Sequence, residues 1–178
     1  MPRQLALLRG INLASKRRVG MADLRRLLEE AGHEDVRTHL QSGNVVLSSP
    51  LSPRKLEALL ERQLADALDF EVPVLVRTRA ELAKVVAHDP LGAVASDPSR
   101  YVVSFLSKRL PAKVARELES AEVAPEQVAV HGRELYAWRP NGLQRSPLSK
   151  LLDDRKLGVV STARNWNTVV KLLELLEQ

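Results

Sequence analysis

Short apolar runs and helix-spaced apolar stripes alternate along the first half of this chain. Residues 4–8 form an apolar run typical of a buried strand, and apolar positions at helical spacing follow over 21–31, ending before a glycine. Two further short runs, 36–39 and 45–47, are separated by Gln-Ser-Gly-Asn at 41–44. These four residues favour a tight turn, so the pattern predicts a hairpin.

A second helix and another strand complete a recognisable order. Ser52 and Pro53 have the residue types of a helix N-cap and first turn, and leucines and alanines at helical spacing continue to residue 68. Residues 73–77 predict a strand, and Thr-Arg-Ala-Glu at 78–81 has capping-box spacing for a short helix to about residue 87. The predicted order is βαββαβ, the ferredoxin-like unit, with one trailing helix.

The second half repeats this order without a residue-level repeat. The pattern predicts strands at 101–106, 128–130, 135–138 and 159–161, helices at 112–120 and 146–157, and a terminal helix from 166. We therefore expect an α+β fold of two tandem ferredoxin-like βαββαβ units, each an antiparallel sheet with helices on one face, plus a C-terminal helix. The expected halves are 1–89 and 99–178, joined by a Pro- and Gly-containing linker at 90–98.

Composition places the chain among ordinary globular proteins. Its 178 residues are 44% hydrophobic and 28% charged, which is enough apolar content for a core. No apolar run approaches the roughly 20 residues that cross a bilayer, so neither a membrane span nor a signal peptide is expected. Cysteine is absent, which excludes disulfides and thiolate chemistry. A cytoplasmic location is the simplest expectation.

Positive charge is concentrated in two separated segments. The chain carries a net charge of +5, and residues 1–20 and 135–173 each carry +5, so the remainder carries −5. Such segments attract anionic partners, although basic surface loops that only aid solubility have the same composition.

Five short motifs carry a resemblance to a known family. They are ALLRGIN at 6–12, MADL at 21–24, QSGNVV at 41–46, PNGLQRS at 140–146 and ARNWNTV at 163–169. In this order they are similar to the bacterial family called domain of unknown function 1697 (DUF1697). The resemblance implies a two-part α+β fold and a special role for the polar residues within the motifs; it implies no particular activity. Members often have glycines in the first loop, where this chain has Leu13-Ala14-Ser15, so a backbone cradle for phosphate is less expected.

Three loops are candidate anion sites, each with a structural alternative, and Arg145-Ser146 before another predicted helix has the same anion-seeking character. The loop 9–20 lies between a strand and a helix, where amides hold anions, but it is no P-loop: Lys16 fits the lysine, while Ser15 and Arg17 replace the second glycine and the Ser/Thr. Residues 41–44 would serve equally as a turn, and 164–168 as a helix start with Asn165 or Asn167 as N-cap. The candidate ligand-binding residues are Arg9, Asn12, Lys16, Gln41, Ser42, Asn44, Arg145, Ser146, Arg164, Asn165 and Asn167.

These residues suggest one hypothesis, a shared polar pocket between the halves whose guanidinium groups suit phosphate or carboxylate. A second hypothesis uses the aromatics of two central strands, Tyr101, Phe105, Tyr136 and Trp138, as a base-stacking platform for RNA, although core packing explains them equally.

Sequence motifs for catalysis are absent. The four histidines are scattered, there is no HExxH or GxSxG, and Asp153-Asp154 is expected in mid-helix on the solvated face. No metal, cofactor or catalytic residue is assigned. The preferred function is binding of a phosphate-bearing small molecule, and the alternatives are a small cofactor-independent enzyme acting on such a molecule and an RNA- or DNA-binding protein. The sequence indicates no membrane partner and no oligomeric state.

Overall fold

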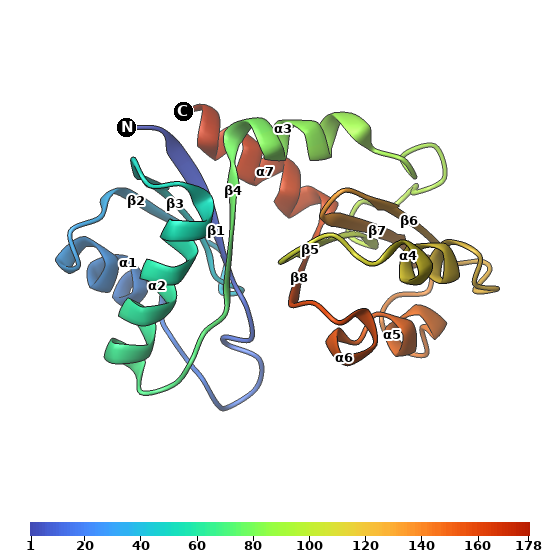
Figure 1. Ribbon diagram of the computed structural model, residues 1–178, viewed down its shortest axis with the longest axis horizontal. Helices are drawn as coiled ribbons and strands as arrows, with labels where there is room; N and C mark the ends of the chain where they lie inside the picture. Colours follow the sequence, from blue (N-terminus) through green and yellow to red (C-terminus); the bar gives the residue numbers. More distant parts are fainter. The chain divides into compact units, whose positions relative to one another are not determined.

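The computed structural model describes all 178 residues (Figure 1). The strands are β1 (Arg3–Leu8), β2 (Glu34–His39), β3 (Asn44–Ser48), β4 (Val74–Thr78), β5 (Tyr101–Leu106), β6 (Gln127–His131), β7 (Glu134–Trp138) and β8 (Ser161–Asn165). The helices are α1 (Met21–Glu30), α2 (Pro53–Leu68), α3 (Arg79–His88), α4 (Ala112–Glu119), α5 (Pro147–Leu151), α6 (Asp154–Leu157) and α7 (Trp166–Glu177). None of these helices has the length and apolar character needed to cross a membrane.

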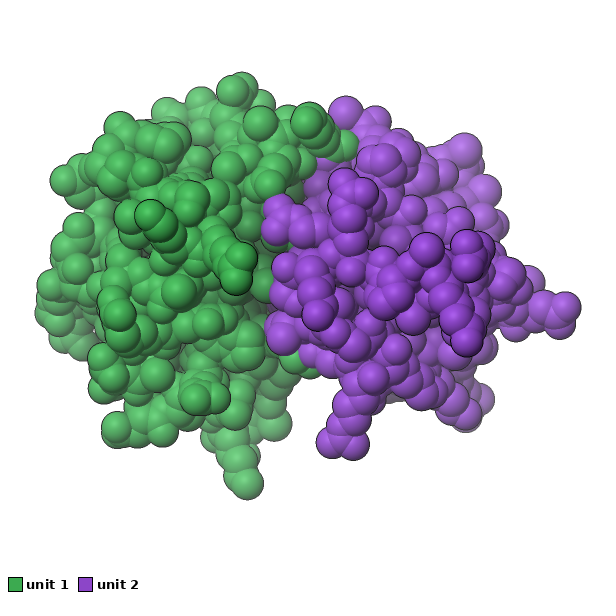
Figure 2. Space-filling view, viewed as in Figure 1, with its two compact units in different colours: residues 1–84, 171–178 green, residues 85–170 purple.

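The chain divides into two compact units, coloured separately in Figure 2. The first comprises Met1–Lys84 and Lys171–Gln178, and the second comprises Val85–Val170. The division expected at 90–98 therefore lies inside the second unit. The chain changes unit within α3 and again within α7, because each of these helices continues without a break beyond the βαββαβ motif that it follows.

Each unit contains one four-stranded antiparallel sheet. The strand orders are β2-β3-β1-β4 and β6-β7-β5-β8, so the first and third strands of each motif are central. Both are the ferredoxin-like order, and the predicted α+β fold of two such units is confirmed.

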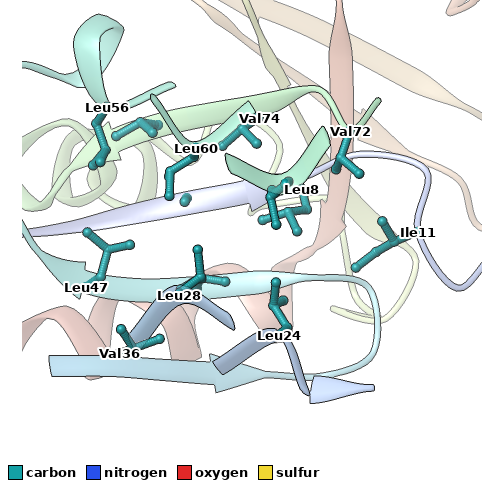
Figure 3. Close-up of a cluster of buried hydrophobic side chains, with 14 of the residues drawn as sticks. Leu8, Ile11, Leu24, Leu28, Val36, Leu47, Leu56, Leu60, Val72 and Val74 are labelled. Atoms are coloured by element: carbon teal, nitrogen blue, oxygen red, sulfur yellow. The ribbon is translucent and has the colours of Figure 1, made fainter. Parts of the chain in front are cut away.

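In the first unit, α1 and α2 cover one face of the sheet (Figure 1). Apolar residues at every fourth position of α2, Leu56, Leu60 and Leu64, are at most 1% exposed and pack with residues of the strands and of α1. Figure 3 shows this cluster. Ile11 belongs to it as well, which ties the first loop to the core. Burial of each leucine contributes about 1.5–3 kcal/mol.

In the second unit, both faces of the sheet are covered. Leu135 and Ala137 of β7 face α4, α5 and α6. On the other face, the Tyr136 hydroxyl donates to the carbonyl oxygen of Val85 at 3.0 Å, and the ring of Trp166 stacks on Tyr101 with centroids 4.8 Å apart. The four aromatics proposed for base stacking are at most 7% exposed. They are core residues, and the stacking platform is not available at the surface.

The region predicted as one helix over 146–157 is two short helices. The carboxylate of Asp153 accepts from the backbone N–H of Arg155 at 2.8 Å, which caps the start of α6 directly after α5 ends. Asp153-Asp154 therefore lie at a helix junction, not in mid-helix. The strand predicted at 159–161 forms at Ser161–Asn165 instead, where the five residues pair with Leu106 to Val102 of β5.

Candidate functional site

A pocket of about 330 Å³ lies in the second unit, where β5 begins and the neighbouring strands β7 and β8 end. Its wall includes the residue before β5, the segment after β7 and the end of β8. The polar and loop residues in this wall are Ser99, Arg100, Arg139, Gly142, Arg164 and Asn165. Two of the sequence motifs, PNGLQRS and ARNWNTV, therefore both contribute to one pocket.

The antiparallel register brings these residues together. Val102 of β5 pairs with Asn165 of β8, and Tyr101 pairs with Trp138 of β7. The ladder extends one step further, because the backbone N–H of Arg139 donates to the carbonyl oxygen of Arg100 at 3.1 Å. Two arginines thus lie opposite each other at the end of adjacent strands.

Arg139 is the most unusual residue of the pocket. Its side chain is 7% exposed, and one terminal nitrogen, Nη1, donates to the hydroxyl of Ser149 at 3.0 Å. The Nε–H is buried without any acceptor. Burial lowers the pKa of Arg139, against the opposing attraction of Glu126. A buried donor without a partner costs about 1–3 kcal/mol, and no group of the chain offsets this cost at Arg139.

The buried carboxylate of Glu126 is hydrogen-bonded to residues other than Arg139. Glu126 is 5% exposed, accepts from the hydroxyl of Ser146, and accepts from the backbone N–H of Leu148 at 3.1 Å. It therefore caps the N-terminus of α5 in place of Ser146, which makes no side-chain cap of its own. Arg139 has no hydrogen-bonded carboxylate, and the attraction of Glu126 acts on it without a hydrogen bond.

Asn165 and Arg164 have different roles. The carbonyl oxygen of the Asn165 side chain accepts from the backbone N–H of Thr168 at 3.0 Å, so Asn165 is the N-cap of α7. Arg164 pairs with Val103, and its Nη1 donates to the Thr162 hydroxyl at 2.8 Å. Alternation places this guanidinium on the sheet face opposite Asn165. Burial lowers the pKa of Arg164 to about 10, which leaves it cationic at neutral pH.

No carboxylate lines the pocket. At the surface beside it, the Oδ2 of Asp97 lies 3.7 Å from the Nε of Arg100. Asp97 accepts from both the hydroxyl and the backbone N–H of Ser99, at 2.6 and 2.9 Å, and these hydrogen bonds lower its pKa. The pocket wall is therefore positively charged.

The predicted residues of the first unit are engaged in loop structure. The side chain of Asn12 accepts from the N–H of Val19 and donates to the carbonyl oxygens of Val19 and Gln41, at 2.7–2.8 Å. The amide nitrogen of Asn44 donates to the His39 carbonyl and the Ser42 hydroxyl, which holds the hairpin turn. Gln41, Ser42 and Lys16 are exposed, and Arg9 is half-buried.

Three residues of the first loop that are not glycine adopt the left-handed backbone conformation that favours glycine. Ala14 has a φ of 89°, and Asn12 and Arg17 each have a φ of 54°. Asparagine tolerates this left-handed region, whereas alanine is strained in it. The hydrogen bonds of Asn12 to Val19 hold the loop closed around this conformation.

The remaining predicted residues lie outside this pocket. Arg145 and Ser146 line a separate hollow beside α5, and Asn167 is exposed in the first turn of α7. Convergence of the candidates from the two units stays a prediction. Sequence reasoning missed Arg100 and Arg139. One signal was present: Arg139 continues the core-facing alternation of Leu135 and Ala137, where a charged residue is out of place.

The comparisons with known proteins agree with this architecture. The solved structure of the conserved bacterial protein SP0830 from Streptococcus pneumoniae is similar to this chain with a TM-score of 0.78, at 24% identity and with 98% of each chain covered. The likeness defines the class, a two-unit ferredoxin-like α+β protein. Residues 1–136 match the family described as "Protein of unknown function (DUF1697)", and the chain belongs to that family. The motifs at 140–146 and 163–169 lie beyond the matched residues.

Proposed function

We propose that this protein binds a small phosphate-bearing anion in the pocket of the second unit. The observation that carries the proposal is the Nε–H of Arg139, which is buried beside the pocket with no acceptor. An anionic oxygen supplies that acceptor and offsets the desolvation of the guanidinium.

Other groups of the pocket fit the same ligand. Arg100 adds a second, more exposed guanidinium, which also pairs with Asp97 and donates to the carbonyl oxygen of Pro140. Asn165 keeps its side-chain N–H₂ group available because its oxygen is used by the cap. Gly142 has a φ of 78° and carries no side chain between its backbone and the pocket. The volume of about 330 Å³ suits a small molecule.

The composition of the wall favours binding over catalysis. It contains no histidine, aspartate, glutamate, lysine or tyrosine, so it offers no general base and only one hydroxyl, that of Ser99. The hypothesis of a nucleic-acid-binding protein loses its best support, because the aromatics that would stack on bases are buried.

The test compares binding of inorganic phosphate by the wild type and by Arg139→Met, using titration calorimetry at low ionic strength. We expect a specific phosphate site in the wild type and its loss in the variant. Arg155→Met is the matched control, since Arg155 is an exposed arginine of the same unit outside the pocket and its loss changes the net charge equally.

Stability separates a binding role from a structural one. Methionine fills the space of the Arg139 stem and removes an unpaired buried donor, at the loss of one bond to Ser149. We expect the free energy of unfolding to stay unchanged or to rise by about 1 kcal/mol, because such replacements are often neutral or stabilising. Equal phosphate binding by both variants, or unfolding of Arg139→Met, would contradict the proposal.

A further inference from the structure

The first unit has a pocket at the position that corresponds to the site of the second unit. Its volume is about 580 Å³, and the start of β1, the segment after β3 and the start of α3 form its wall. The polar residues of this wall are Arg3, Gln4, Thr78 and Arg79, and the apolar ones include Leu51 and Leu176.

Backbone bonds establish the correspondence. The N–H of Ser49 donates to the carbonyl oxygen of Pro2 at 3.0 Å, as that of Arg139 does to Arg100 in the second unit. Thr78 caps α3 by accepting from the N–H three residues on, at 3.1 Å, as Asn165 caps α7. Gln4 pairs with Thr78 as Val102 pairs with Asn165. The two pockets therefore occupy the same corner of a duplicated fold.

The corner in the first unit contains a buried acceptor instead of a buried donor. Gln4 is 2% exposed, and its Nε2 donates to the carbonyl oxygens of Leu51 at 2.7 Å and Ser49 at 3.2 Å. Exchanging the amide oxygen and nitrogen would set an oxygen against two carbonyls, so the orientation is determined by chemistry. The Oε1 atom is left buried with no donor from the chain.

Groups that attract an anion line the same pocket as Gln4. The backbone N–H groups of Arg79 and Ala80 are the first of the ten-residue helix α3, where no preceding helical turn supplies a carbonyl acceptor. Arg3 adds a guanidinium with no ion pair, while Arg79 has only a surface pair with Glu177 at 3.4 Å. A helix N-terminus with cationic side chains stabilises a carboxylate.

We propose that this pocket binds a small apolar α-amino acid. The ammonium group donates to Oε1 of Gln4, the carboxylate lies at the N-terminus of α3 beside Arg3, and the side chain contacts Leu51 and Leu176. Neither a simple anion nor a simple amine uses both halves of this arrangement. The site is independent of the phosphate pocket, because all of its residues belong to the first unit.

The test uses the full chain and three probes of similar size: L-leucine, 4-methylpentanoate, which lacks the amine, and 3-methylbutylamine, which lacks the carboxylate. Binding is followed by the NMR resonances of the Gln4 side-chain amide and of the Ala80 backbone N–H. We expect L-leucine to shift both at concentrations at least tenfold below those that the other probes need. No shift with L-leucine, or equal affinity for 4-methylpentanoate, overturns the proposal.

Variants separate the two contacts. Gln4→Met removes the acceptor and is expected to weaken L-leucine binding at least tenfold. Arg3→Gln is expected to weaken it several-fold without affecting the core, which keeps the test valid if Gln4→Met does not fold. Arg25→Gln is the control, an exposed arginine on α1 away from the pocket. Arg139→Met is expected to leave L-leucine binding unchanged, so failure of either site is recognised separately. Unchanged affinity in both Gln4→Met and Arg3→Gln overturns the proposal.

Discussion

Single buried polar atoms define both proposed sites. Arg139 Nε and Gln4 Oε1 lack partners although each side chain is almost fully buried. In the sequence, Gln4 is one residue of an apolar run, and only its place in the alternation with Leu135 and Ala137 distinguishes Arg139 from an ordinary strand end. What distinguishes these two atoms is burial without a hydrogen-bond partner, which depends on residues from other strands and helices. Such information is long-range, which is why local pattern reasoning selected loop residues instead.

The two tyrosines give a residue-scale prediction on pH. Tyr101 and Tyr136 are the only tyrosines of the chain and are at most 1% exposed. Burial raises the pKa of both phenols well above the ordinary value of 10.0. We therefore expect no phenolate absorbance in the near ultraviolet from the native protein at pH 10–11. In concentrated denaturant, both phenols are expected to titrate near pH 10.

The sign of the linked stability follows from the same shifts. An acid whose pKa is higher in the folded state holds its proton while the unfolded chain loses it, so the folded state is favoured below pH 10 and loses stability as pH rises above it. Urea unfolding midpoints are expected to fall between pH 10 and 11, together with the appearance of phenolate. A native protein that shows one or two titrating phenols near pH 10 would contradict the assigned burial.

At the scale of elements, the order of strands and helices follows from local pattern, whereas their ends depend on tertiary partners. Ser52 and Ser146 begin α2 and α5 as predicted, yet neither caps with its side chain. For α5 the cap comes from Glu126, twenty or more residues earlier. Likewise β8 begins at Ser161 because its partner in β5 determines which residues pair. The spacing of residues along the chain predicts neither the cap from Glu126 nor the register of β8 with β5.

The hairpin between β2 and β3 gives a prediction at this scale. Gly43 has a φ of 86°, and a Cβ there would lie 2.7 Å from Cδ1 of Ile11 and 2.9 Å from Cβ of Leu8. Gly43→Ala therefore adds backbone strain of about 1–2 kcal/mol and a core clash of about 1–3 kcal/mol. We expect the free energy of unfolding, from urea denaturation, to fall by about 2–5 kcal/mol.

Gly32 is the matched control for this substitution. It has a φ of 93°, and no atom lies within 4 Å of the place that a Cβ would occupy, so Gly32→Ala tests backbone strain alone. We expect it to cost only about 1–2 kcal/mol. If the two variants lose equal stability, the contact of the turn with Ile11 and Leu8 contributes nothing, and the argument from close approach is wrong.

At the scale of the whole molecule, duplication of the topology is readable from the sequence but the partition of the chain is not. Pro90, Gly92 and Pro98 have the composition of a linker, which placed the expected boundary there. Instead, Leu91 is 9% exposed and its N–H is bonded to the hydroxyl of Tyr101 at 3.3 Å. This segment packs on the second sheet, and turn-forming residues only allow the chain to follow that surface.

The end of α7 provides the corresponding prediction. Leu172 and Leu176 are 0% and 3% exposed, and both belong to residues 171–178, which lie with the first unit although they follow the last strand of the second. Truncating either buried leucine to alanine removes packing worth about 2–5 kcal/mol. Because the affected contacts belong to the first unit, Leu176→Ala is expected to reduce native-state hydrogen-exchange protection in β1, β3 and β4 more than in β5, β7 and β8.

Glu174→Ala is the control, because Glu174 is exposed and lies between Leu172 and Leu176 in the sequence; it is expected to leave both sheets protected. Greater loss of protection in β5, β7 and β8 would mean that the C-terminal residues stabilise the unit that they directly follow, and that sequence adjacency, not the compact division, governs how this chain unfolds.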